Sequence, residues 1–359
     1  MRIIQLIDSL DIGGAERMAV SYANSLEKSI EFSGLVASRK EGELKNKMDA
    51  GVSYLFLNRK KSVDLNAIFN LRNYCKNNKV QIIQAHSSSF FLACMVKLML
   101  PKIAIIWHDH YGNFVPPKRK NSFFIRIFSV LFQGVIAVDF DLEAWSKKNL
   151  FCKNVIYLQN YIPENKEYSR ETILHGIDGK RVLYLANLRS QKNHLMLVEV
   201  VNSIYKKFPD WTFHLVGSDL KDDYSETIKA KIKNYQLEEV IFLYGAKKDV
   251  ENVIKQSDIG VFTSNSEGLP LALLEFGLYK KPVIATNVGQ IPFVIKQNIS
   301  GFISEPKDVI AFSTNLATIQ MDEKLRVKFG DELHKTITEN YRENVVISNY
   351  ISWISKIKI

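Results

Sequence analysis

Short apolar runs alternate with longer amphipathic stretches along most of this chain. In the first half, the apolar runs are Ile3–Ile7, Phe32–Ala37, Gln81–Ala85, Ile103–Trp107 and Gly134–Val138. Stretches between them, such as Ala15–Glu27 and Leu65–Lys76, have the spacing of helices. Because parallel strands joined by crossover helices are covered on both faces, this alternation predicts a parallel α/β sheet.

A second series of the same kind follows in the other half of the chain. Its apolar runs are Arg181–Leu185, Thr212–Val216, Val240–Tyr244, Ile259–Thr263 and Pro282–Ala285. Between the two series, residues 160–167 are polar, contain Pro163 and lack periodicity, which is typical of a linker. We therefore expect an α/β protein with two Rossmann-like domains, residues 1–165 and 166–343.

The C-terminal segment 344–359 has its own pattern. Apolar residues recur there at intervals of three and four, which predicts an amphipathic helix; they are Val346, Ile347, Tyr350, Ile351, Trp353 and Ile354.

Length and composition agree with two globular domains. The chain has 359 residues, of which 46% are apolar and 24% charged. Its three cysteines, Cys75, Cys94 and Cys152, are widely spaced, which fits reduced thiols in the cytoplasm better than a disulfide framework or a zinc site. The first apolar run is too short for a secretory signal, and charges and a proline interrupt the longest run, residues 90–107. No transmembrane segment is expected.

The net charge of +10 lies mainly in the first half, where residues 1–164 contain 22 Lys and Arg against 14 Asp and Glu. Such a basic surface suits anionic lipid or a phosphorylated acceptor. Nucleic acid is not an expected partner, because no recognised reader motif accompanies the charge. One basic segment, Lys118–Lys120, precedes the apolar, aromatic residues 123–132. Residues 118–132 form either a helix lying on an anionic membrane surface or a helix buried against the first sheet.

The densest chemical signal is the segment from Ser264 to Glu275. It follows the strand predicted at 259–263, and Pro270 suits the first position of a helix. Glu267 and Gly268 then lie on the strand-to-helix turn, where unpaired N–H groups favour an anion such as a phosphate. Glu275, inside the helix, would repel a diphosphate, so its expected partner is a neutral diol such as a ribose. Alternatively, both glutamates are solvated helix charges.

This segment resembles the donor-binding core of the retaining GT-B glycosyltransferases, the group 1 or family 4 class. The resemblance reaches segments spread over nearly the whole chain, namely Gly13-Gly14-Ala15-Glu16, His108-Asp109, Leu188 to Lys192, Val216-Gly217 and Asp249-Val250. It implies the GT-B architecture of two Rossmann-like domains facing across a cleft. The first is the acceptor-side domain, with helix 344–359 packing back on it, and the second binds the nucleotide sugar.

The resemblance also implies how the donor is held. Without a metal, Lys192 is expected to stabilise the negative charge that develops on the departing diphosphate. Most family members have an arginine where this chain has Asn187, and Arg189 is either its replacement or a solvated charge. Glu267, with the amides of Gly268 and Leu269, is expected to hold the sugar.

The remaining expected site residues come from the same resemblance. Gly13 and Gly14 are expected near the donor diphosphate, and Gly217 beside the nucleotide. His108 is expected to contact the reacting sugar in a hydrogen-bonding role. His86 is a weaker candidate, and a core histidine is the preferred interpretation there.

No cofactor or metal is expected. Asp139-Phe140-Asp141 imitates the metal-binding Asp-x-Asp motif of GT-A enzymes, but alternating carboxylates at a strand end are common surface features. The dinucleotide fingerprint Gly-x-Gly-x-x-Gly does not occur around Gly13, which argues against a nicotinamide enzyme.

We therefore expect a cytoplasmic, metal-independent retaining glycosyltransferase. It would move a hexosyl or N-acetylhexosaminyl group from a nucleoside-diphosphate sugar to a glycan or lipid-linked glycan, in the synthesis of a bacterial capsule, O-antigen or exopolysaccharide. Two alternatives are a GT-B sugar-nucleotide epimerase and a catalytically degenerate partner subunit that only binds sugar nucleotide.

Overall fold

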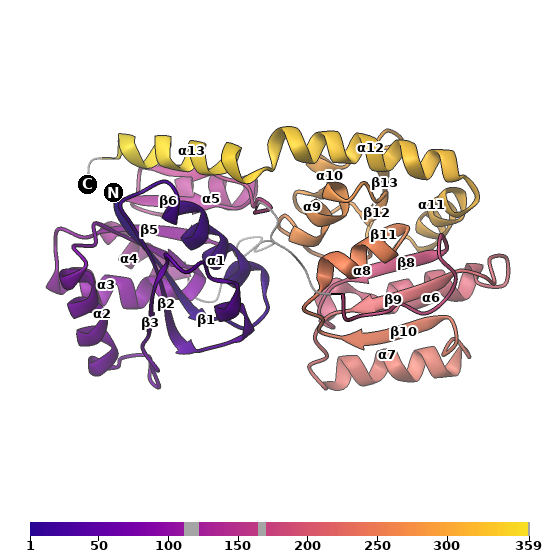
Figure 1. Ribbon diagram of the computed structural model, residues 1–359, viewed down its shortest axis with the longest axis horizontal. Helices are drawn as coiled ribbons and strands as arrows, with labels where there is room; N and C mark the ends of the chain where they lie inside the picture. Colours follow the sequence, from indigo (N-terminus) through magenta and orange to yellow (C-terminus); the bar gives the residue numbers. More distant parts are fainter. Residues whose placement is uncertain (111–121, 164–169, 358–359) are drawn as a thin grey trace. The chain divides into compact units, whose positions relative to one another are not determined.

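The computed structural model describes residues 1–110, 122–163 and 170–357. The chain forms two compact units, shown in Figure 1. Unit 1 comprises Met1–Pro163 together with Glu343–Ile359, and unit 2 comprises Glu164–Arg342. The C-terminal helix therefore belongs to the same unit as the N-terminal strand.

Unit 1 is built on a seven-stranded parallel sheet with the order β3-β2-β1-β4-β5-β6-β7. The strands are β1 (Arg2–Ser9), β2 (Phe32–Lys40), β3 (Ser53–Phe56), β4 (Ile82–His86), β5 (Ala104–Asp109), β6 (Gly134–Ala137) and β7 (Val155–Tyr157). Its α-helices are α1 (Gly14–Glu27), α2 (Leu65–Asn77), α3 (Phe90–Met99), α4 (Ser122–Phe128), α5 (Phe140–Asn149) and α13 (Glu343–Lys356).

Unit 2 is built on a six-stranded parallel sheet with the order β10-β9-β8-β11-β12-β13. The strands are β8 (Arg181–Leu185), β9 (Thr212–Val216), β10 (Ile241–Gly245), β11 (Ile259–Phe262), β12 (Val283–Thr286) and β13 (Gly301–Ser304). Its α-helices are α6 (His194–Ile204), α7 (Asp223–Asn234), α8 (Val250–Gln256), α9 (Leu271–Leu278), α10 (Ile291–Val294), α11 (Val309–Met321) and α12 (Glu323–Asn340).

The predicted α/β class with two Rossmann-like sheets is confirmed, and every predicted strand is present with small shifts at its ends. Three strands were not predicted: β3, β7 and β13. All three lie at a sheet edge and have only three or four residues. Every residue of β3 and β7 is only partly buried, so neither strand requires the continuous apolar run that marks a central strand.

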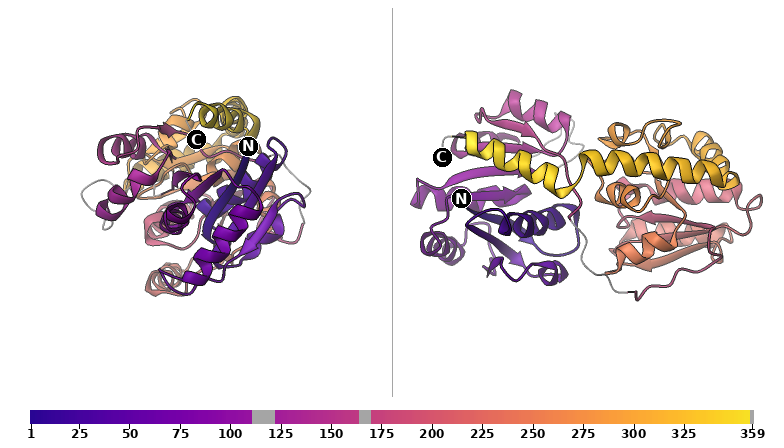
Figure 2. Two further views of the ribbon diagram at one scale, coloured as in Figure 1. Left: turned by 90° about the vertical axis from the view of Figure 1, so that its left-hand side faces the viewer. Right: turned by 45° about the horizontal axis from the view of Figure 1, so that its top comes forward.

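The tail helix α13 packs on unit 1, as both views of Figure 2 show. Val346, Tyr350 and Ile354 are buried on it. A Cβ atom at Gly134 of β6 would lie 2.7 Å from the Trp353 ring, so the glycine gives this helix room to approach the sheet.

Residues 90–107 divide as expected into α3 and β5. Within the described part of the chain, none of the helices combines the length and apolar character that crossing a bilayer requires. The three cysteines are buried free thiols.

Candidate functional site

The loops after β8 and β11 bring Lys192 and Glu267 together. These strands are neighbours in the sheet, and Gly260 of β11 pairs with Leu183 of β8, so their carboxyl ends meet at one edge. Lys192 Nζ lies 2.6 Å from Glu267 Oε1 and 2.7 Å from Oε2. The lysine side chain is 19% exposed and the carboxylate 6%, so this is a mostly buried ion pair.

Two further side chains hold this pair in place. The Ser264 hydroxyl donates to Glu267 Oε1 at 2.6 Å. The Tyr184 hydroxyl donates to the backbone oxygen of Lys192 at 2.5 Å and lies 3.1 Å from Ser264 Oγ. Neither residue was predicted as part of the site. Tyr184 lies inside a strand run, and only the position of Ser264, three residues before Glu267, offered a signal.

The turn at Glu267 and Gly268 is braced by the loop after β12. The backbone N–H of Gln290 donates to the oxygen of Gly268 at 2.9 Å. Gly289 has φ +56°, and a Cβ atom there would lie 2.0 Å from the Glu267 oxygen. A glycine is therefore required at position 289 for this turn to form.

Helix α9 begins one residue later than predicted. Pro270 has ψ 124°, so it is the N-cap and Leu271 is the first helical residue; the prediction of Pro270 at the first helical position is wrong. The extended ψ turns the chain out of the β11 loop before the helix starts. Glu275 lies inside this helix and is 7% exposed, and Leu269 of the turn is buried. A buried carboxylate is not the solvated helix charge of the alternative interpretation.

Asn187 and Gly217 have structural roles at the ends of β8 and β9. Asn187 Oδ1 accepts a hydrogen bond from the Ser218 N–H at 2.8 Å. A Cβ atom at Gly217 would lie 2.1 Å from the oxygen of Ala186, so only glycine fits between these loops. Arg189 is exposed, and no hydrogen bond or ion pair joins its side chain to the described residues. Asn187 therefore braces this loop.

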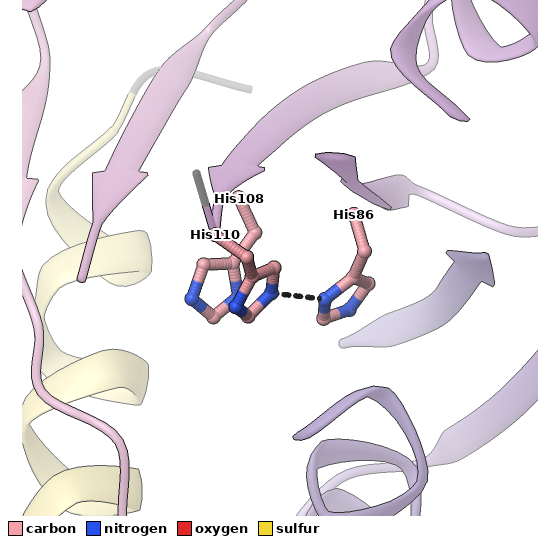
Figure 3. Close-up of side chains that lie close together, drawn as sticks. All are labelled: His86, His108 and His110. Atoms are coloured by element: carbon pink, nitrogen blue, oxygen red, sulfur yellow. Dashed lines mark hydrogen bonds between the residues drawn. The ribbon is translucent and has the colours of Figure 1, made fainter. Parts of the chain in front are cut away.

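In unit 1, three histidines gather at the carboxyl ends of β4 and β5, as Figure 3 shows. His86 Nδ1 lies 2.8 Å from His110 Nε2, and His86 Nε2 lies 2.8 Å from Gln5 Oε1. The His108 and His110 rings stack with their centroids 4.0 Å apart. Burial lowers the pKa of His86 and His108 well below the ordinary value and that of His110 to about 3, so all three are neutral at pH 7.

Neutral imidazoles are metal ligands, and one nitrogen of each of these rings lies within 4.8 Å of the others. The ring orientations do not suit a shared ion. The His108 and His110 planes are only 29° apart and stacked, so their in-plane lone pairs run side by side and do not converge. The His86 and His110 nitrogens share a proton at hydrogen-bond distance. The described geometry is that of a hydrogen-bonded stack, and a metal would require the rings to turn.

Gly13 and Gly14 lie at the start of α1, after β1. Gly13 is the N-cap with an extended backbone, φ −154°, so its conformation does not require glycine. A Cβ atom at Gly14 would meet no other atom within 4 Å. The space beside Gly14 is therefore open within the described structure.

Asp139 and Asp249 are engaged in backbone hydrogen bonds. Asp139 is the N-cap of α5 and accepts from the Leu142 N–H at 2.7 Å. Asp249 accepts from the N–H groups of Glu171 and Thr172 at 2.9 and 2.7 Å. Both carboxylates therefore have a structural role, which is to pair backbone N–H groups.

Two family profiles match this chain. Residues 165–336 match the family described as "Glycosyl transferases group 1", and residues 12–157 match "Glycosyltransferase Family 4". Together they cover most of both units.

Characterised relatives are distant in sequence and similar in length. The UDP-Gal:alpha-D-GlcNAc-diphosphoundecaprenol alpha-1,3-galactosyltransferase of Escherichia coli is 24% identical over 97% of this chain and 93% of its own. The amylovoran biosynthesis glycosyltransferase AmsD of Erwinia amylovora is 27% identical over 92% of this chain and 93% of its own. Among solved structures, Anabaena Alr3699/HepE in complex with UDP and glucose has a TM-score of 0.82 at 15% identity, covering 99% of this chain and 100% of that one. A glycosyltransferase from Rickettsia africae has a TM-score of 0.79 at 19% identity, covering 99% and 98%.

Proposed function

Because the chain belongs to the group 1, or family 4, glycosyltransferases, which are retaining enzymes of GT-B fold, we propose that it transfers a hexosyl or N-acetylhexosaminyl group from a nucleoside-diphosphate sugar to a growing glycan. The observation that carries the proposal is the buried pair Lys192–Glu267 on the β8 and β11 loops. A preorganised cation beside a carboxylate, at the carboxyl edge of a parallel sheet, suits a ligand that has both a diphosphate and hydroxyl groups.

In the proposed reaction the glycosidic bond between the sugar and the diphosphate breaks, and a bond forms between the same sugar carbon and an acceptor oxygen. The departing diphosphate gains negative charge and accepts the acceptor's proton. Lys192 stabilises that charge by moving its ammonium from Glu267 to the phosphate oxygens. Glu267, still held by Ser264, is then available to accept hydrogen bonds from sugar hydroxyls.

We assign Glu275 to the ribose and the N–H groups of Gly268 and Leu269 to the sugar. Gly217 borders the nucleotide, and Arg189 is an exposed, solvated cation on the loop that carries Lys192. In unit 1, Gly13 and Gly14 give a ligand access to the backbone, and His108 contacts the sugar. Because Lys192 supplies the electrostatic stabilisation of the departing diphosphate, the proposed transfer requires no metal or cofactor.

The names of the relatives support the donor and product classes. The E. coli relative is named for UDP-galactose and a diphosphoundecaprenol-linked acceptor, and AmsD for amylovoran biosynthesis. We therefore place this chain in the synthesis of a bacterial surface polysaccharide, acting in the cytoplasm on a lipid-linked glycan.

A lipid-linked acceptor requires the enzyme to reach a membrane surface, and α4 has an exposed apolar face that suits membrane binding. Phe123, Phe124, Ile127 and Val130 on and after this helix are 50% to 69% exposed. The neighbouring Phe151 is 57% exposed, with the Arg126 guanidinium 5.3 Å from its ring centroid. Lys118, Arg119 and Lys120 lie outside the described residues. Ile125 of the same helix is buried in the core of unit 1, so α4 packs on the core with one face and leaves this apolar face exposed. The exposed face supports the membrane interpretation of residues 118–132.

The test is a panel of UDP-, GDP- and ADP-sugars, measured for binding by thermal shift and for turnover with and without lipid-linked acceptors. We expect one nucleotide class to raise the melting temperature and its sugar to be transferred only when acceptor is present. Conversion of the sugar nucleotide without acceptor would instead identify an epimerase. Binding without turnover across the acceptor panel would identify a partner subunit, and either result overturns the proposal.

A further inference from the structure

A buried hydrogen-bonded chain connects the C-terminal helix to His108. The Tyr350 hydroxyl on α13 donates to Gln84 Oε1 on β4. Gln84 Nε2 in turn lies 2.9 Å from His108 Nδ1 on β5. The side chains of Tyr350 and Gln84 have no exposed surface and His108 has 1%. The three residues therefore interact with one another inside unit 1, away from solvent.

The direction of these bonds determines where the His108 proton lies. Because the Tyr350 hydroxyl donates to the amide oxygen, the NH₂ group of Gln84 faces the imidazole. An amide NH₂ can only donate, so His108 Nδ1 must be the acceptor. A neutral imidazole has a single N–H group, and burial keeps this one neutral by lowering its pKa. The proton of His108 is therefore on Nε2.

That Nε2–H group has no hydrogen-bond partner among the described residues, although it is buried. Buried donors are almost always paired, and leaving one unpaired is costly. His86 and His110 do not satisfy it, because they bond to each other and to Gln5. The vacant donor is suited to an oxygen atom of a ligand.

We infer that Gln84 and Tyr350 are positioning residues that hold His108 as an Nε2–H donor for a substrate oxygen, and so prevent it from acting as a base at that nitrogen. The inference rests on the proposed function for the identity of the ligand, a sugar hydroxyl or another oxygen of the substrate. It gives the C-terminal helix a part in the chemistry of unit 1 through Tyr350.

The tautomer is measured without any substrate. In ¹⁵N-labelled protein at pH 7, long-range ¹H–¹⁵N correlation distinguishes a protonated Nε2 from a protonated Nδ1 in His108. We expect Nε2–H in the wild type. Gln84→Glu places a carboxylate against His108 Nδ1. Because a carboxylate can only accept a hydrogen bond, the tautomer should reverse to Nδ1–H. Tyr350→Phe removes the hydroxyl that orients the amide and should give a mixture of the two tautomers.

Tyr22→Phe is the matched control. Tyr22 is also fully buried, its ring centroid lies 5.1 Å from that of Tyr350 and 5.4 Å from that of His108, and its hydroxyl has no hydrogen-bond partner among the described residues. Removing this hydroxyl should leave both the tautomer and the turnover unchanged. Thermal melting checks that each variant is folded, and Tyr350→Phe remains informative if the buried charge of Gln84→Glu prevents folding.

Turnover then tests the role of the tautomer. We expect kcat to fall by about tenfold in Gln84→Glu and by less in Tyr350→Phe, with the donor KM nearly unchanged, because the lost interaction acts at the reaction centre. A wild-type spectrum with Nδ1–H overturns the inference. So does an unchanged kcat in a variant whose tautomer has reversed. Failure of the proposed function is a separate result, the absence of turnover by the wild type with every sugar nucleotide.

Discussion

The Lys192 ammonium lies within 2.7 Å of both carboxylate oxygens of Glu267, a residue 75 positions away in the chain. The two charges neutralise each other in a mostly buried setting, and Ser264 holds the carboxylate from a second direction. A bound diphosphate would compete with Glu267 for the lysine. The pair therefore keeps both charges preorganised before the donor arrives.

The first prediction concerns this cation. Lys192→Ala should lower kcat by about 10²–10³ and raise the donor KM much less, because the lysine acts most strongly as the diphosphate departs. Steady-state kinetics with the donor identified in the nucleotide panel measures both constants. Arg189→Ala is the matched control, since Arg189 is an exposed cation in the same loop. We expect its kcat to change by less than about threefold, as for a solvated charge. Near-normal turnover of a folded Lys192→Ala enzyme would contradict the diphosphate assignment.

The second prediction concerns the ribose. Glu275→Gln should weaken donor binding by roughly ten- to a hundredfold, because a carboxylate that accepts hydrogen bonds from two hydroxyls contributes about 1.5–3 kcal/mol. Calorimetric titration of the nucleoside diphosphate measures this. Glu323→Gln at the exposed start of α12 serves as the control and should bind normally. An unchanged affinity in Glu275→Gln would remove the ribose assignment.

The third prediction concerns metal. Activity should survive EDTA, because the Lys192 ammonium stabilises the leaving group in place of a metal ion. The double variant Asp139→Asn and Asp141→Asn should also remain active, since an asparagine at 139 can still cap α5. Activity is measured after exhaustive chelation and again after addition of Mg²⁺ or Mn²⁺. Full loss on chelation with recovery on adding either ion would show that the transfer needs a metal.

The fourth prediction concerns the exposed face of α4. The protein should sediment with phosphatidylglycerol vesicles at low salt and dissociate as salt rises, each nearby basic residue contributing about 1 kcal/mol. The double variant Phe123→Ser and Phe124→Ser should reduce sedimentation, as should glutamine at Lys118, Arg119 and Lys120, without lowering turnover of a water-soluble acceptor. Ile310→Ser, at an 82% exposed position of unit 2, should have no effect. Wild-type protein that stays in solution with the vesicles at low salt would refute membrane binding by the exposed face of α4.

The fifth prediction concerns acid. Burial lowers the pKa of five histidines. In unit 1, the pKa of His86 and that of His108 lie well below 6.5, and the pKa of His110 is about 3. In unit 2, the pKa of His194 is about 4 and that of His214 is about 3. Between pH 6.5 and these lower values the unfolded chain binds more protons than the folded one, so stability is full above pH 6.5 and falls as pH decreases.

Each such histidine contributes up to about 1.4 kcal/mol per pH unit in that window. Urea unfolding followed by tryptophan fluorescence at pH 7.5 and 5.5 should therefore show a lower midpoint at pH 5.5. In His110→Asn, the slope of the unfolding free energy against pH should decrease by the contribution of about one bound proton. Equal midpoints at the two pH values would mean that the histidines are not held neutral.

Local sequence was enough to predict the central strands of both sheets. Central strands such as β1 and β8 are buried on both faces, so they require continuous apolar runs that are visible in the sequence. The turn between β11 and α9 was also predictable, because glycine and proline restrict the backbone locally. The edge strands β3 and β7 escaped prediction because an edge strand with partly exposed faces has no such requirement.

The tertiary structure alone decided which side chains meet. Lys192 and Glu267 are partners because β8 lies beside β11, and Gln84 meets Tyr350, 266 residues later, because α13 returns to unit 1. Strand order and helix docking depend on how the whole core packs, so no local pattern records them. The sequence could suggest that Glu267 and His108 carry chemistry. The charge partner of Glu267 and the position of the proton on His108 depend on groups that only the folded chain brings within hydrogen-bond distance.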